Sequence, residues 1–279
     1  MTRTALVLGG GGVTGIAWEL GLLKGLADAG VDLTGADVVV GTSAGSVVGA
    51  QVTSGLPLDV LYDSQLEPPD REIGAKLSRG TLLKMALPVL IPGKPRRKLQ
   101  RIGRMALKAH EPGGEERVEV IRSRIQVDAW PDRDLRVTSV EAETGRFRVF
   151  DRGSGVDLVH AVAASCAVPL VWPAVTIEGR HYIDGGVRST ANADQAKGCD
   201  AVVVIAPLPQ SVSKAASIPV QLRSTGASRS AVVSPDKQAL ADIGRNVLDP
   251  AKRADAARSG LRQAAEVVDQ VRAAWLPVA

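Results

Sequence analysis

The chain has 279 residues, of which 45% are hydrophobic, a composition typical of a folded globular protein with a sizeable core. The formal net charge is only +4 and aromatic residues make up 3% of the chain, so neither extensive disorder nor a base-stacking nucleic-acid surface is indicated. Two cysteines, Cys166 and Cys199, are too few for a disulfide framework and have no neighbours at metal-ligand spacing. We therefore expect buried thiols in a reducing compartment, no metal and no nucleic-acid partner.

The N-terminal segment superficially resembles a secretion signal, because an apolar run occupies residues 5–8. Four glycines follow that run at once, and the next segment carries Glu19 and Lys24, which is typical of a strand, a loop and a helix. The best candidate for a membrane span, residues 82–91, is short and is interrupted by a lysine and a proline. We therefore expect a cytoplasmic protein that does not span a membrane.

Short apolar runs predict strands along the whole chain, at residues 5–8, 38–40, 135–140, 147–150, 175–177, 182–183, 201–205 and 231–233. Helical spacing of apolar residues lies between several of them, at Ile16, Leu20, Leu23 and Ala27 and, near the C-terminus, at Leu261, Ala265, Val268, Val271 and Trp275. This alternation predicts a three-layer α/β/α fold with a mostly parallel central sheet, which we expect to form a single domain over residues 1–279.

Turn and helix-start signals mark several connections between these elements. Residues 143–146, Glu-Thr-Gly-Arg, predict a hairpin turn between two strands. Ser234-Pro235 and Asp249-Pro250 are typical helix starts, with a capping side chain before a proline. The polar, serine-rich residues 210–230 lack a clear period and predict a surface connection.

Residues 57–130 interrupt this rhythm with proline-rich, basic and helical sequence, and we interpret them as an inserted cap over the functional edge of the sheet. Basic residues cluster there, with no acid before Glu111: Lys84, Lys94, Arg96, Arg97, Lys98, Arg101, Arg104 and Lys108. Apolar residues lie beside them: Leu82, Leu83, Met85, Leu87, Val89, Leu90 and Ile91. Such a segment could rest on an anionic membrane surface, or form the solvated face of a cap helix. Nucleic-acid binding is the weaker third interpretation.

Residues 39–46 contain the pattern Gly-x-Ser-x-Gly at Gly41, Ser43 and Gly45, between a predicted buried strand and a predicted helix. This context is typical of a nucleophile elbow, in which a sharp turn exposes the serine and a Cβ atom at either glycine would obstruct the neighbouring backbone. The alternative is a serine whose hydroxyl only caps the following helix.

A glycine-rich loop, residues 9–15, follows the first predicted strand and opens the first helix. Its glycines fit the dinucleotide-binding pattern, but the acid expected at the end of the second strand is missing, since Asp32 and Asp37 precede that strand. The alternative is an oxyanion hole, in which the amides of Gly10, Gly11 and Gly12 meet the negative oxygen of a tetrahedral intermediate. Loops after neighbouring strands converge at one sheet edge, so we expect this loop to lie near Ser43.

A nucleophilic serine needs a base, and the three histidines are poorly placed for a Ser-His-Asp triad. His110, His160 and His181 all precede Asp184, the best acid candidate, and no histidine follows it. Asp184 ends an apolar run and is followed by two glycines, which is also the pattern of an ordinary Asp-Gly turn. We expect a Ser43–Asp184 dyad, in which the carboxylate takes the serine proton directly.

Together these motifs resemble the patatin-like phospholipase family, which has a glycine-rich loop after its first strand, a Gly-x-Ser-x-Gly elbow and an Asp-Gly-Gly acid motif. Residues 163–169, Trp172-Pro173 and residues 182–186 also look like the family's approach to its acid. The resemblance implies a patatin-like fold and no cofactor, with site residues Ser43 (nucleophile), Asp184 (general base) and Gly10, Gly11 and Gly12 (oxyanion loop). The chain departs from the family at Thr14, where Arg or Lys is usual.

We therefore expect a serine acyl hydrolase of the lipase or phospholipase type that acts on lipid esters, with peripheral contact to a membrane surface. One alternative is a catalytically weak lipid- or partner-binding protein of the same fold. Another is an acyltransferase, which would use the same residues.

Overall fold

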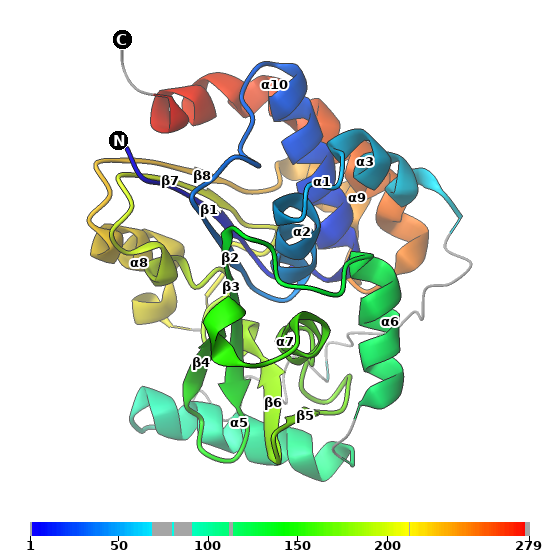
Figure 1. Ribbon diagram of the computed structural model, residues 1–279, viewed down its shortest axis with the longest axis vertical. Helices are drawn as coiled ribbons and strands as arrows, with labels where there is room; N and C mark the ends of the chain where they lie inside the picture. The colour runs from blue at the N-terminus through cyan, green and yellow to red at the C-terminus, as the bar shows by residue number, and fades with distance from the viewer. Residues whose placement is uncertain (1, 69–79, 81–90, 112–113, 212, 277–279) are drawn as a thin grey trace.

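A mixed β-sheet forms the centre of the molecule (Figure 1), and the computed structural model describes residues 2–68, 80, 91–111, 114–211 and 213–276. Parallel strands lie side by side in the order β8 (Arg229–Val233), β7 (Ala201–Ile205), β1 (Thr4–Leu8), β2 (Val38–Gly41) and β3 (Asp134–Glu141). The strands β4 (Phe147–Phe150), β6 (Arg180–Asp184) and β5 (Val175–Ile177) extend the sheet around β3 with antiparallel pairing. The predicted α/β fold with a mostly parallel central sheet is confirmed.

Helices cover both faces of the sheet, which explains why its central strands are almost uniformly apolar. On one face lie α1 (Gly12–Asp28), α2 (Ala44–Thr53), α3 (Leu58–Leu66), α6 (Glu115–Ile125), α7 (Leu158–Ser165), α9 (Lys237–Ile243) and α10 (Arg253–Trp275). The thinner layer on the other face contains α8 (Ile218–Thr225) and a 3₁₀ turn, η3 (Ala193–Ala196). Further 3₁₀ turns are η1 (Arg152–Ser154), η2 (Gly185–Val187), η4 (Lys214–Ala216) and η5 (Pro250–Lys252). Side chains of β1 alternate between the two cores, with Leu6 and Leu8 in the thick one and Ala5 and Val7 in the thin one.

The ends of β2 and β6 meet on one edge of β3. Val137 of β3 pairs with both Gly41 of β2 and Phe150 of β4, so β2 and β4 occupy opposite edges. Ser139 of β3 likewise pairs with both β4 and Asp184 of β6, so β6 is also opposite β4. Because β2 runs parallel to β3 and β6 runs antiparallel, their C-terminal ends point at each other along the same edge.

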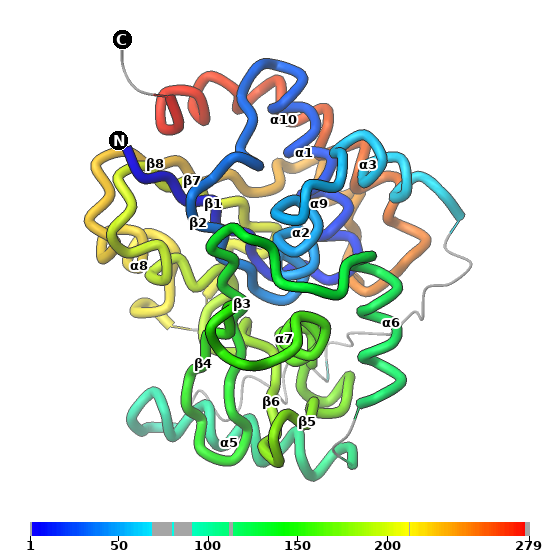
Figure 2. The backbone as a smooth tube through the Cα atoms, in the orientation of Figure 1, coloured from blue at the N-terminus to red at the C-terminus, as the bar shows by residue number. Residues whose placement is uncertain are grey.

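The segment expected to form an inserted cap contributes elements to two places. The helix α3 packs on α1 and α10 in the thick helical layer. The helix α5 (Pro95–Ala109) packs on β3 and β6 at the end of the molecule opposite the two termini (Figure 2). The helix α6 packs on α2 and α7. Residues 69–79 and 81–90 lie outside the described residues, and with them most of the apolar positions expected beside a membrane, so the cap and the single-domain organisation stay predictions.

The structure confirms some predicted connections and corrects one. The hairpin turn at residues 143–146 is confirmed, because the Glu141 amide donates to the Arg146 carbonyl at 2.9 Å. The helix start at Asp249 is also confirmed, whereas the start expected at Ser234-Pro235 lies two residues further on, because α9 begins at Lys237 and is capped by Asp236. The serine-rich residues 210–230 are not only a surface connection. They contain α8, whose Ile218, Gln221 and Thr225 are buried, because apolar and small polar residues recur there at helical spacing.

Both cysteines are free and buried, as expected from their small number. None of the helices within the described ranges combines the length and the apolar character that crossing a bilayer requires. The acids that argued against dinucleotide binding have structural partners instead: the Asp37 carboxylate accepts hydrogen bonds from the Thr4 amide at 2.7 Å and the Thr4 hydroxyl at 2.9 Å.

Candidate active site

Ser43 lies in a sharp turn between the end of β2 and the start of α2. Its backbone angles, φ 52° and ψ −116°, fall in a region that a residue with a side chain rarely adopts. The Ser43 side chain makes no capping hydrogen bond to α2, a helix that the structure describes in full. The geometry is therefore that of a nucleophile elbow and not that of a helix cap.

Hydrogen bonds on both sides of Ser43 hold this strained backbone, whose cost is on the order of 1–3 kcal/mol. The Ser43 amide donates to the Ser165 hydroxyl at 2.9 Å. The Ser43 carbonyl accepts from the Ser46 hydroxyl at 2.6 Å and from the Cys166 thiol at 3.4 Å. Ser165 is the last residue of α7 and Cys166 is its C-cap, so this buried helix fixes the elbow from a distant part of the sequence.

The two glycines of the elbow are needed because other backbone passes through the space that a side chain would fill. A Cβ atom at Gly45 would lie 2.2 Å from the Leu8 carbonyl oxygen, and one at Gly41 would lie 2.5 Å from the Ser46 Cα. The Gly45 amide donates to the Gly9 carbonyl at 2.9 Å, which brings the elbow against the glycine-rich loop. The predicted proximity of these two motifs is thus present in the structure.

Asp184 is the last residue of β6, and its side chain reaches Ser43 across the junction of β2 and β6. Burial raises its pKa to about 6, although hydrogen bonds from the Ser43 side chain and the Gly186 amide oppose that rise. The Gly186 amide lies 2.7 Å from the Asp184 Oδ1 and orients the carboxylate. Both side chains are nearly inaccessible to solvent, with relative exposures of 8% for Ser43 and 5% for Asp184.

The glycine-rich loop lies beside the serine, but its amides differ in availability. A Cβ atom at Gly10 would be only 3.5 Å from the Ser43 Cβ. The Gly10 amide already donates to the Thr190 carbonyl at 2.7 Å. By contrast, the amides of Gly11 and Gly12 donate no hydrogen bond to any residue in the described ranges. Since α1 begins at Gly12, these two amides also lie at the positive end of a helix dipole.

Thr14 is buried and faces the segment that follows α9. Its amide and hydroxyl both lie 3.2 Å from the Val247 carbonyl, so the residue ties the start of α1 to the segment before α10. A threonine can hold the loop in this way without a charge. It contributes no cation to the space in front of Ser43.

A cavity of about 260 Å³ opens in front of the serine and aspartate. Apolar side chains from several elements form most of its wall: Val13, Ile16, Ile102, Val168, Pro169, Trp172, Val187, Leu208, Val247 and Leu248. Among the described lining residues the cations are Arg117 and Arg124, both on α6. An apolar wall with a few polar groups at one end suits an acyl chain attached to a polar ester.

The arginines on α6 and the residues supporting the elbow were not expected from the sequence. Arg117 and Arg124 are seven residues apart in an ordinary charged helix, and nothing local distinguishes them. Ser165 and Cys166 lie in the residues 163–169 that carried the family resemblance, which was a usable signal.

The three histidines lie elsewhere in the described structure and none lines the cavity. The His160 Nδ1 lies 3.1 Å from Asp157 at the start of α7, and the His181 ring contacts Glu143 on the antiparallel hairpin. Their positions agree with the expectation that they take no part in a triad.

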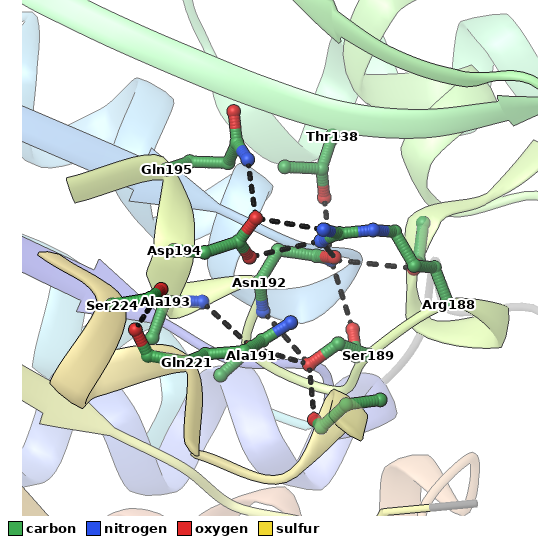
Figure 3. Close-up of polar contacts among 12 residues, drawn as sticks. Thr138, Arg188, Ser189, Ala191, Asn192, Ala193, Asp194, Gln195, Gln221 and Ser224 are labelled. Carbon is green, nitrogen blue, oxygen red and sulfur yellow. Dashed lines mark hydrogen bonds and ion pairs between the residues drawn. The ribbon is translucent and has the colours of Figure 1, made fainter. Parts of the chain in front are cut away.

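A buried polar network lies behind the junction of β2 and β6, and its centre is Asn192 (Figure 3). The Asn192 Nδ2 lies 3.1 Å from the Thr42 hydroxyl, 3.2 Å from the Thr138 hydroxyl and 3.3 Å from the Gly185 carbonyl. Thr42 precedes Ser43 and Gly185 follows Asp184, so a single side chain connects the residues next to both members of the pair.

Arg188 sets the orientation of this amide. Its guanidinium donates to the Asn192 Oδ1 at 2.7 Å and forms a bidentate pair with Asp194 at 2.9 and 2.7 Å (Figure 3). The same guanidinium lies 4.1 Å from the centre of the Phe147 ring. The Asn192 oxygen therefore faces Arg188, and the amide nitrogen faces the two strand ends. Asn192 itself has φ 51°, a left-handed conformation that asparagine tolerates better than most residues.

Comparison with known proteins gives one family match. The model of the family described as Patatin-like phospholipase matches residues 6–197. No match was found among curated proteins. Two solved structures are similar. VipD from Legionella pneumophila has 13% identity and a TM-score of 0.49, and the match covers 96% of this chain and 67% of VipD. The type III effector protein ExoU has 19% identity and a TM-score of 0.46, and the match covers 97% of this chain and 53% of ExoU. The chain thus spans about half the length of ExoU.

The Asn192 network generates a prediction about stability. Asn192→Gly keeps the left-handed backbone at no steric cost but removes the side chain that joins Thr42 to Gly185. We expect the free energy of unfolding to fall by about 1–3 kcal/mol, because buried polar groups lose their partner. Chemical denaturation measures the change. Gln238→Ala removes an amide from an exposed position and is the matched control; equal stability of the two variants would contradict the prediction.

Proposed function

Because the chain belongs to the patatin-like phospholipase family, we propose that it is a serine acyl hydrolase that acts on lipid esters through Ser43 and Asp184. Membership of this family supports lipid hydrolase activity in general. The observation that carries the finer proposal is that Ser43 and the buried Asp184 lie together at the wall of a largely apolar cavity, close enough for the serine to influence the pKa of the carboxyl. Ser43 lies on a strained elbow, as a nucleophile does.

In the proposed reaction Asp184 acts as the general base. Its carboxylate takes the proton of the Ser43 hydroxyl as the Ser43 Oγ attacks the carbonyl carbon of the ester. A pKa of about 6 leaves the carboxylate ionised at neutral pH while making it a stronger base than an exposed aspartate. Asp184 then returns the proton to the departing alcohol, which leaves an acyl-serine. A water molecule, deprotonated by Asp184, releases the fatty acid and restores the serine.

The negative oxygen of each tetrahedral intermediate needs donors, and we assign this role to the Gly11 and Gly12 amides. Their position beside Ser43 and their availability support the assignment, and one such donor contributes roughly 3 kcal/mol to transition-state stabilisation. The Gly10 amide is already bonded to Thr190, so Gly10 contributes close packing against Ser43 and not a donor. An acyltransferase would use the same residues and differ only in the acceptor that reaches the acyl-serine.

We further propose that α5 contacts an anionic membrane surface. This helix and the residue before it carry Lys94, Arg96, Arg97, Lys98, Arg101, Arg104 and Lys108, with no acid among them. Its opposite face is apolar and buried: Ile102 and Ala106 pack with Ala142 and Ile183. Since Ile102 also lines the cavity, a membrane bound to the cationic face would lie near the site where a lipid ester must enter.

The nucleophile is tested with a fluorophosphonate probe, which labels activated serines. We expect the parent to be labelled, Ser43→Ala to remain unlabelled and Asp184→Asn to react at least about 100-fold more slowly, because the general base is lost. The neighbouring hydroxyl variant Ser54→Ala serves as a control that should label normally. Labelling of Ser43→Ala at the parent rate would rule out the proposed nucleophile.

The pH dependence tests the base. Because the carboxylate form is the active one, hydrolysis of a soluble ester should decline as the pH falls through about 6. Stability should change in the opposite direction. Because folding raises the pKa of Asp184, the free energy of unfolding should fall as the pH rises from 3.8 to about 6. Asp184→Asn should therefore be inactive yet more resistant to denaturant above pH 6, by up to about 3 kcal/mol. A profile that is flat across this range would exclude Asp184 as the base.

Membrane contact is measured by sedimentation with vesicles of phosphatidylcholine alone or with phosphatidylserine. The triple variant Arg97→Glu, Arg104→Glu, Lys108→Glu should bind the anionic vesicles at least about 100-fold more weakly, since each surface cation contributes about 1 kcal/mol. Arg223→Glu, Lys237→Glu, Arg258→Glu changes the net charge equally at exposed sites on other helices and should bind as the parent does. Equal loss in both triple variants would indicate net charge alone and not α5.

A further inference from the structure

Two arginines of α6 share the cavity with the proposed catalytic pair. Arg117 and Arg124 are two helical turns apart, so they lie on the same face of α6, and both line the cavity. Arg117 is only 7% exposed, and its guanidinium carbon lies 4.2 Å from the centre of the Trp172 ring. Such stacking fixes the plane of the guanidinium.

Electrostatic coupling shows that these charges extend to the nucleophile. The Cys166 thiol, which contacts the Ser43 carbonyl, has a pKa raised by burial and by the negative charge of Asp184. Arg117 and Arg124 both oppose that rise in pKa, so their positive charges act on a group that contacts Ser43. Both arginines also interact with other groups of the protein.

The positive charges of the cavity therefore come from α6 and not from the glycine-rich loop, where the family motif would place a cation. Position 14, where the family usually has Arg or Lys, holds a buried threonine bonded to the Val247 carbonyl. The remaining wall of the cavity is largely apolar. A cavity lined by the nucleophile, by two arginines and by a largely apolar wall suits an ester that carries an anionic group, and planar guanidinium groups match phosphate oxygens in particular.

We propose that Arg117 and Arg124 form an anion subsite that selects lipid esters bearing a phosphate group close to the scissile bond. The proposal rests on the proposed function for the identity of the reacting ester, but the binding of the phosphate does not depend on turnover. Both arginines are specificity-determining residues for the substrate and take no part in the proton transfer.

Binding is measured on Ser43→Ala protein, which removes turnover. The probe is a short-chain 1-O-alkyl lysophosphatidic acid, an ether that cannot be hydrolysed, and its neutral partner is the 1-O-alkylglycerol with the same chain. Arg117→Gln and Arg124→Gln should each weaken the phosphate ligand at least about tenfold in calorimetry, since a charge-assisted hydrogen bond is lost. The neutral ligand should bind all variants alike. A titration with inorganic phosphate alone shows whether the subsite prefers a lipid headgroup to the free ion.

The matched control is Arg122→Gln on the same helix. Arg122 pairs with Glu119 and Asp128 and does not line the cavity, so its loss changes the charge of α6 without changing the subsite. Arg117→Lys keeps the charge but loses the planar fork, and we expect intermediate affinity; it also keeps the test valid if Arg117→Gln folds poorly.

The possible outcomes separate the subsite from the hydrolase. Selective loss of phosphate affinity at positions 117 and 124 supports the subsite, even if the parent fails to label with fluorophosphonate, in which case only the hydrolase proposal falls. Equal loss for the neutral ligand, or the same loss in Arg122→Gln, overturns the subsite. Inorganic phosphate that binds as tightly as the lipid overturns the assignment to a lipid headgroup.

Discussion

The site depends on one topological constraint: β2 and β6 end against each other on the same edge of β3. A parallel strand places its last residues and the following elbow at this point, and an antiparallel strand arriving from the opposite direction places its last residue there too. Ser43 and Asp184 therefore line the same cavity although 141 positions separate them in the sequence. No flexible loop has to carry either side chain to the other.

This junction also accounts for the buried chemistry around it. The end of a paired strand is poor in water, so the Asp184 carboxylate is desolvated and its pKa rises. The strained backbone at Ser43 persists because rigid neighbours on α2 and α7 supply its hydrogen bonds. Asn192 adds a fixed connection behind both strand ends, so relative movement of β2 and β6 would break buried hydrogen bonds. Stability and the geometry of the site are coupled here.

The sequence was sufficient for features that depend on local patterns. Apolar runs marked the strands, and the glycines at positions 41 and 45 marked the elbow, because steric demands act over a few residues. Features that arise from long-range contact were not predictable in this way. The pairing of β6 with β3, the support from Ser165 and the orientation of Asn192 each involve residues far apart in the chain. The helix within residues 210–230 was missed because its short apolar period is hidden by serines.

The effect of the missing cation at position 14 depends on contacts that only the structure shows. In the sequence, Thr14 removes a charge from the glycine-rich loop. In the structure, Thr14 holds the start of α1 through hydrogen bonds to the Val247 carbonyl, which require no charge. Positive charge enters the cavity instead from Arg117 and Arg124 on α6, beside an apolar wall. Under the proposed function, the loop binds the oxyanion, and the arginines of α6, which lie outside the motif, bind the anionic group of the substrate.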